Sequence, residues 1–109
     1  MVIVSGKERE LMKEEMQSIR VVDYIAEFIV SLGVRNVFML SGTGSVYLDD
    51  AVAFHNKITY TCARHEAAAV IMATAAAKLS GGLGVVISTT GPGATNAITG
   101  VTGAWIDSI

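Results

Sequence analysis

Short apolar runs alternate along this chain with longer helical stretches, and this alternation constrains the fold more than any other feature. The runs that predict strands, from their length and their β-branched residues, are residues 34–40, 58–62 and 83–88. The stretches that predict helices, from their periodicity or their alanine content, are residues 21–32, 46–54, 64–79 and 94–105. Such an alternation specifies an α/β domain, in which right-handed crossovers connect parallel strands and helices cover both faces of the sheet.

Individual segments add detail to this prediction. The first helix carries one apolar stripe at helical spacing, and Gly33 is expected to end it. The helix over residues 64–79 is apolar nearly all round, so we expect it to be buried. Residues 85–87 form a continuous apolar run, which is typical of a parallel strand covered on both faces. Cys62 lies inside the second predicted strand and is interpreted as an inert packing residue.

The composition excludes several classes of protein. At 109 residues the chain holds one domain or part of one, and its apolar fraction of 51% excludes intrinsic disorder. A net charge of −2 offers no basic surface, so we expect neither nucleic acid nor a membrane as a partner. The single cysteine cannot form an internal disulfide and the Cys/His clusters of zinc sites are missing. A reducing, cytoplasmic location is therefore favoured.

Charge is distributed unevenly along the chain. Residues 7–15 hold seven of the 18 charged side chains, and we interpret residues 1–18 as a charged, solvated leader without a signal peptide. Residues 79–109 hold one charge, and their glycines argue against a membrane span and for a soluble protein. We expect this segment to pack against a partner or further strands. Because the chain stops where the alternation requires another strand, we expect a fragment truncated after three strands.

The loops that follow the three predicted strands form the expected ligand site. In a parallel sheet the carboxyl ends of the strands meet at one edge, and ligands bind in the loops there. These loops are residues 41–44, 63–66 and 89–93. The first and third are rich in glycine, but Tyr47 and Asn96 replace the third glycine of a dinucleotide motif. A plain strand-to-helix turn is the alternative interpretation for each of these two loops.

Glu66, in the middle loop, is the candidate catalytic residue. A helix N-terminus favours its ionised form, whereas burial in an apolar helix raises its pKa. A carboxyl group between these two effects is suited to share a proton with a ligand nitrogen. The alternative is a first-turn carboxylate that only caps backbone amides. We interpret His65 as a loop or core histidine, and we expect Arg64 to pair with Asp49 or Asp50 or to be solvated.

Two sequence motifs together carry a family resemblance. They are Arg64-His65-Glu66 and, downstream, Thr89-Thr90-Gly91-Pro92-Gly93-Ala94-Thr95-Asn96, followed by Ala104-Trp105-Ile106-Asp107-Ser108-Ile109. With these motifs the sequence resembles the thiamine-diphosphate-dependent enzymes of the acetolactate synthase type. The resemblance covers residues 19–109 and implies a partial N-terminal pyrimidine-binding domain. It implies further that this domain takes part in binding thiamine diphosphate.

The resemblance also assigns roles to residues at the predicted edge. Glu66 matches the family's cofactor-activating glutamate, whose carboxyl group hydrogen-bonds the pyrimidine nitrogen N1′ and favours the tautomer that activates the thiazolium carbon. The positions that match contacts to the pyrimidine end of the cofactor are Thr89, Pro92 and Asn96 in the third loop and Leu40, Ser41 and Gly42 at the first. No residue of this chain matches a metal ligand.

The function that the resemblance implies is decarboxylation of a 2-keto acid, followed by ligation of the resulting enamine to a second carbonyl, as in branched-chain amino acid biosynthesis. It implies Mg²⁺ as well, with ligands in a C-terminal domain that this chain lacks. It also implies a homodimer or homotetramer with the cofactor at the subunit interface, so the 109 residues alone are expected to be inactive.

Three departures from the family pattern keep alternatives open. Ser41-Gly42-Thr43 stands where the family commonly has Pro-Gly-Gly, Ala67 follows the glutamate in place of a polar residue, and residues 75–78 replace Gly-Tyr-Ala-Arg. One alternative is another thiamine-diphosphate decarboxylase or carbon–carbon lyase, for example in the synthesis of sugar or polysaccharide precursors. The other is a non-catalytic α/β binding module.

Overall fold

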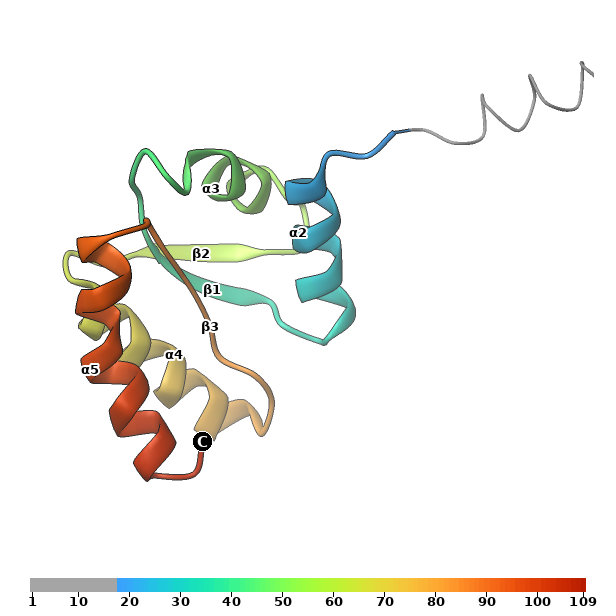
Figure 1. The fold of residues 1–109 in the computed structure, drawn as a ribbon. Coiled ribbons are helices and arrows are strands. Elements are labelled where there is room, and N and C mark those ends of the chain that lie inside the picture. The colour runs from blue at the N-terminus through green and yellow to red at the C-terminus, as the bar shows by residue number, and fades with distance from the viewer. Residues whose placement is uncertain (1–17) are drawn as a thin grey trace, which may run out of the picture.

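The computed structural model describes residues 18–109, whose arrangement Figure 1 shows. In chain order the elements are α2 (Val21–Ser31), β1 (Asn36–Leu40), α3 (Val46–Ala53), β2 (Thr59–Cys62), α4 (Glu66–Ser80), β3 (Val85–Ser88) and α5 (Pro92–Ile106). This order confirms the predicted alternation of helices and strands. The leader was predicted over residues 1–18; residues 1–17 lie outside the described part, so that interpretation stays a prediction.

The three strands form one parallel sheet in the order β2-β1-β3. Asn36 at the start of β1 lies opposite Thr59 of β2, and Leu40 at its end lies opposite Ser88 of β3. The chain therefore moves from β1 to one side and then crosses back over β1 to the other side. Because both crossovers are right-handed by the general rule, this reversal places α3 and α4 on opposite faces of the sheet.

Helices accordingly cover both faces, as predicted (Figure 1). On one face α2 packs against α3, and on the other α4 packs against α5 and over β1 and β3. The first face holds the main apolar core, in which Val37 of β1 and Val52 of α3 are fully buried. The second face is built from small residues of α4, among them Ala69, Ala73 and Ala77, which allow helix and sheet to approach closely.

Two predictions about burial are wrong. Helix α4, which is apolar nearly all round, was expected to be buried, but it buries one face only, and Ile71 and Leu79 are 62% and 90% exposed. The sheet and α5 cover only one flank of α4 within the described residues. Cys62 was interpreted as a packing residue, but its side chain is exposed. It lies on β2, an edge strand whose four residues are all exposed.

The end of α2 agrees with the prediction, whereas the start of α5 differs from it. Gly33 has φ +85°, the left-handed conformation that ends a helix, and α2 stops just before it. Helix α5 begins at Pro92 rather than Ala94, because proline needs no hydrogen-bond partner for its nitrogen at the first helical position. Within residues 18–109, no helix has the length and apolar character that crossing a bilayer requires.

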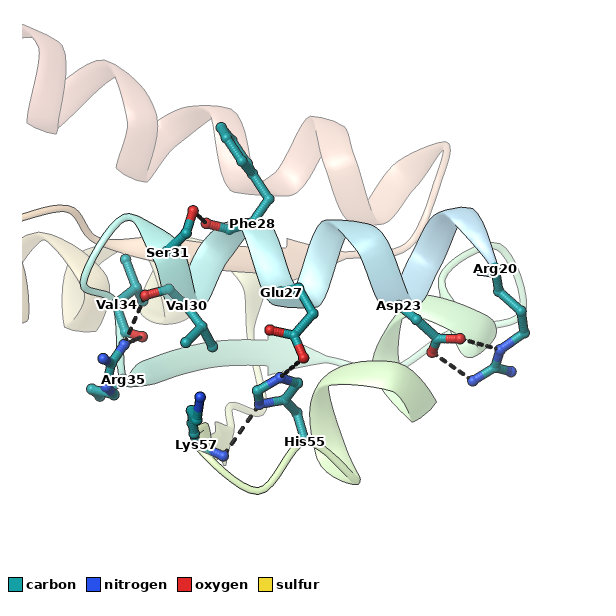
Figure 2. Close-up of polar contacts among 10 residues, drawn as sticks. All are labelled: Arg20, Asp23, Glu27, Phe28, Val30, Ser31, Val34, Arg35, His55 and Lys57. Atoms are coloured by element: carbon teal, nitrogen blue, oxygen red, sulfur yellow. Dashed lines mark hydrogen bonds and ion pairs between the residues drawn. The ribbon is translucent and has the colours of Figure 1, made fainter. Parts of the chain in front are cut away.

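Polar contacts lie within α2 and between α2 and the segments beside it, as Figure 2 shows. Arg20 donates two hydrogen bonds of 2.7 Å to Asp23 in the first turn. Near the other end, the Nε2 atom of His55 lies 3.2 Å from Glu27 Oε1. The Nδ1 atom of His55 accepts the backbone N–H of Lys57 at 3.2 Å, so in the neutral ring Nε2 carries the proton and donates to Glu27.

Candidate functional site

The loops after β1 and β3 lie side by side at the carboxyl edge of the sheet. Strands β1 and β3 are neighbours, while the helices that follow them, α3 and α5, lie on opposite faces (Figure 1). An open parallel sheet has its ligand crevice at such a reversal of connection. One hydrogen bond joins the two loops directly, because the backbone N–H of Gly44 donates to Thr89 Oγ1 at 3.1 Å.

The two loops approach so closely that no side chain fits between them. A Cβ atom added at Gly42 would lie 2.6 Å from Thr89 Oγ1, a separation that real Cβ atoms do not show. Thr89 is half-buried as a result of this contact. Glycine at position 42 is therefore a requirement of this packing.

Glu66 reaches this edge from the second loop. It is the first residue of α4, directly after the extended N-cap residue His65, and its side chain is half-buried. Its Oε2 atom accepts a hydrogen bond of 2.6 Å from Asn96 Nδ2 in the second turn of α5. Its Oε1 atom would lie 3.2 Å from a Cβ atom at Gly93, so α5 and the carboxyl group are in close contact. The middle and third loops are thereby joined.

The pKa of Glu66 lies below the ordinary value of a glutamate. The largest cause is the hydrogen bond from its own backbone N–H, followed by the one from the Asn96 amide. Burial acts in the opposite direction, and the neighbouring His65 lowers the pKa further. Both opposing effects expected from the sequence are present, and the lowering effects prevail because a half-exposed carboxyl group keeps much of its hydration.

The predicted site residues lie at one edge but differ in their contacts. Gly42 and Thr89 contact each other, and Asn96 binds Glu66 directly. Leu40 ends β1 and is half-buried, whereas Ser41 and Pro92 are exposed beside the same loops. The roles of all these residues in cofactor binding stay predictions.

Of the two alternatives expected for Arg64, the structure agrees with solvation, because the side chain is exposed. Among residues 18–109 Arg64 forms no ion pair with Asp49 or Asp50; the cation nearest to Asp50 is Arg20, at 3.8 Å. His65 is a loop histidine, as interpreted, and it is exposed. Its Nε2 atom lies 3.4 Å from Asn96 Nδ2, so it belongs to the surroundings of Glu66.

Sequence reasoning missed the pair formed by Ser45 and Asp49. The hydroxyl group of Ser45 donates to Asp49 Oδ2 at 2.8 Å, and both residues are buried behind the first loop. The available signal was their spacing of four residues, which places two polar side chains on one face of a helix in an otherwise apolar segment. The sequence did not indicate that this face is turned inward.

Residues 19–109 match the family described as thiamine pyrophosphate enzyme, N-terminal TPP binding domain. The chain belongs to this family. Among curated proteins it is 39% identical to the acetolactate synthase isozyme 3 large subunit of Escherichia coli over 86% of the chain, and 41% identical to the acetolactate synthase large subunit of Lactococcus lactis over 78%. The chloroplastic acetolactate synthase of Arabidopsis thaliana is 36% identical over 80%. The chain spans only 16%, 15% and 13% of these relatives' lengths.

The residues at the sheet edge fit the cofactor of this family. A planar heteroaromatic ring can approach a backbone that carries no side chain, and Gly42 offers such a backbone beside Thr89. A ring nitrogen needs a carboxyl group as its partner, and Glu66 supplies one at the same edge of the sheet. The described residues hold no group of three His, Cys, Asp or Glu side chains able to bind a metal.

Proposed function

We propose that this chain is the pyrimidine-binding part of an enzyme of the acetolactate synthase type, which decarboxylates a 2-keto acid and joins the product to a second carbonyl compound. One observation carries the proposal: the carboxyl group of Glu66, bound by Asn96 at 2.6 Å, lies at the carboxyl edge of the sheet in close contact with the start of α5. The relatives that are named acetolactate synthases support the choice of reaction.

Each predicted site residue has a part in this proposal. Glu66 hydrogen-bonds the pyrimidine nitrogen and holds a proton between its carboxyl group and the ring, while Asn96 orients the carboxyl group. A ring that covers Glu66 removes water from it, which raises its pKa toward that of the ring nitrogen. Leu40, Ser41, Gly42, Thr89 and Pro92 line the ring. When bound, thiamine diphosphate supplies the electron sink for the decarboxylation.

We propose further that the enzyme is a homodimer or homotetramer with the cofactor at the subunit interface. The outer face of α5 supports this, because its large apolar residues are unusually exposed, Trp105 to 82% and Ile106 to 73%. Mg²⁺ is proposed to be held by ligands outside residues 18–109. The exposed free thiol of Cys62 favours a reducing compartment, so we propose a cytoplasmic location.

A second candidate function is favoured by the first loop. Ser41 and Thr43 stand where related enzymes commonly have proline and glycine, and both side chains are exposed at the site's edge. They would offer hydroxyl groups to a substrate richer in polar groups than a simple 2-keto acid. The candidate is therefore another thiamine-diphosphate decarboxylase or carbon–carbon lyase that acts on sugar-like substrates.

Calorimetric titration of the complete protein that carries this chain tests the proposal. We expect saturable heat on adding thiamine diphosphate with Mg²⁺, and a carbon–carbon ligation product when a simple 2-keto acid such as pyruvate follows. Heat without a ligation product, but with carbon dioxide release from a polyhydroxylated keto acid, would favour the second candidate. No heat at high cofactor concentration would contradict both and favour a non-catalytic binding module.

A further inference from the structure

Two buried polar side chains lie directly behind the first loop, and they are bonded to each other. Two polar residues are buried among residues 18–109, namely Ser45 with 7% and Asp49 with 6% of its surface exposed. The Ser45 hydroxyl lies 2.8 Å from Asp49 Oδ2 in the first turn of α3. The pair is therefore isolated from solvent and close to the residues proposed to line the ring.

Ser45 connects Asp49 to the loop backbone. Its backbone N–H donates to the carbonyl oxygen of Gly42 at 3.0 Å, and its hydroxyl oxygen lies 3.2 Å from the same carbonyl. The hydroxyl group has one proton, so Asp49 and the Gly42 carbonyl compete for it. Gly44, which directly precedes Ser45, donates its backbone N–H to Thr89 Oγ1. The orientation of Ser45 thus bears on both contacts between the first and third loops.

The hydrogen bonds of the fold satisfy the carboxyl group at position 49 only in part. Within the described residues its Oδ1 atom is buried and has no hydrogen-bond partner. A buried, unsatisfied carboxyl oxygen costs free energy, and without the carboxyl group the Ser45 hydroxyl still has the Gly42 carbonyl oxygen as an acceptor at 3.2 Å. Residues that oppose stability in this way occur mainly where function requires them.

We propose that Asp49 is a positioning residue that acts through Ser45 to hold the first loop against Thr89. The acceptor Oδ2 draws the Ser45 hydroxyl inward, which leaves the backbone N–H of Ser45 as the bond that shapes the turn at Gly42. That turn directs the Gly44 N–H toward Thr89 and keeps the first and third loops in contact. The inference rests on the proposed function, since it concerns the loops proposed to line the ring.

The test compares three variants of the complete protein, Asp49→Ala, Asp49→Asn and Asp50→Ala. Asp50 is the matched control, because it is the next residue of α3 but is exposed. We expect Asp49→Ala to weaken thiamine diphosphate binding about tenfold while the turnover number at saturating cofactor stays within about twofold. Asp49→Asn keeps one oxygen for Ser45 and is expected to restore the affinity. The melting temperature of Asp49→Ala is expected to stay equal or rise.

A second measurement does not depend on the cofactor. Hydrogen exchange of the Gly44 amide, followed by mass spectrometry without ligand, is expected to be about tenfold faster in Asp49→Ala and unchanged in Asp50→Ala. Unchanged affinity, equal losses in Asp49→Ala and Asp50→Ala, or a lower melting temperature with unchanged affinity would each overturn the inference. If the wild type binds no thiamine diphosphate, the proposed function fails separately, and unchanged exchange at Gly44 would then overturn the loop contact as well.

Discussion

At the scale of single residues, the contact between Asn96 and Glu66 strengthens the preference of the proposed site for an ionised carboxyl group. The carboxyl group accepts a 2.6 Å bond from the amide and lies at a helix N-terminus, and its pKa is lowered. The site therefore presents an acceptor at neutral pH before any ligand arrives. Glu66 was identified from the sequence because it is the only carboxylate in the three loops. Its partner was expected to bind cofactor, and its bond to Glu66 depends on the packing of α5 on α4.

Removing the amide is expected to raise the pKa of Glu66. In Asn96→Ala the second largest cause of the lowering is gone, so the pKa moves back toward the ordinary value of a glutamate. Because the folded-state pKa is lowered, ionised Glu66 stabilises the fold above that ordinary value, and this contribution is lost as the pH falls through the folded-state pKa. An NMR titration of labelled glutamate carboxyl carbons measures the shift. Equal pKa values in the two proteins would contradict this assignment.

At the scale of elements, the order of helices and strands followed from hydrophobic periodicity, since each segment contains only one kind of pattern. The exposure of α4 could not be predicted, because an alanine-rich helix has no polar face to mark its solvent side. The buried Ser45–Asp49 pair was missed for the opposite reason: polar residues at helical spacing usually face water.

The seam between α4 and α5 depends on one glycine. A Cβ atom at Gly100 would lie 2.6 Å from Val70 Cβ and 3.0 Å from the Ala67 carbonyl oxygen, so Gly100→Ala must push the helices apart. We expect it to lower the free energy of unfolding by about 1–3 kcal/mol. Gly103, on the same helix, has no atom within 4 Å of such a Cβ. Gly103→Ala is expected to stabilise by up to about 1 kcal/mol through helix propensity. Urea denaturation measures the change in the free energy of unfolding for both variants. Changes of the same sign would contradict the described packing.

At the scale of the whole molecule, large apolar side chains remain uncovered on the α4–α5 side of the sheet. Leu79, Trp105 and Ile106 are each more than 70% exposed. Residues 79–109, to which they belong, hold one charged side chain. Such a surface is typical of an interface rather than of a free face. The low charge after Lys78 indicated this from the sequence alone, but not which surface would cover it.

Sedimentation of the complete protein tests the proposed assembly. We expect a dimer or tetramer, and we expect Trp105→Lys to shift it toward monomer, because a charge would be placed in an apolar interface. Lys57→Ala, an exposed change beyond α3, is the control and is expected to leave the assembly intact. A monomeric wild-type protein would contradict the proposal.

The Glu66 carboxyl group is proposed to act on the bound cofactor ring, and the turnover number of Glu66→Gln in the complete protein measures whether it does. At saturating thiamine diphosphate and Mg²⁺ we expect the turnover number to fall by about 100-fold or more, because the amide cannot hold the shared proton. Glu27→Gln, a change to an exposed glutamate on α2, is expected to keep wild-type turnover. Wild-type turnover in Glu66→Gln, with the cofactor bound, would contradict this role of the Glu66 carboxyl group.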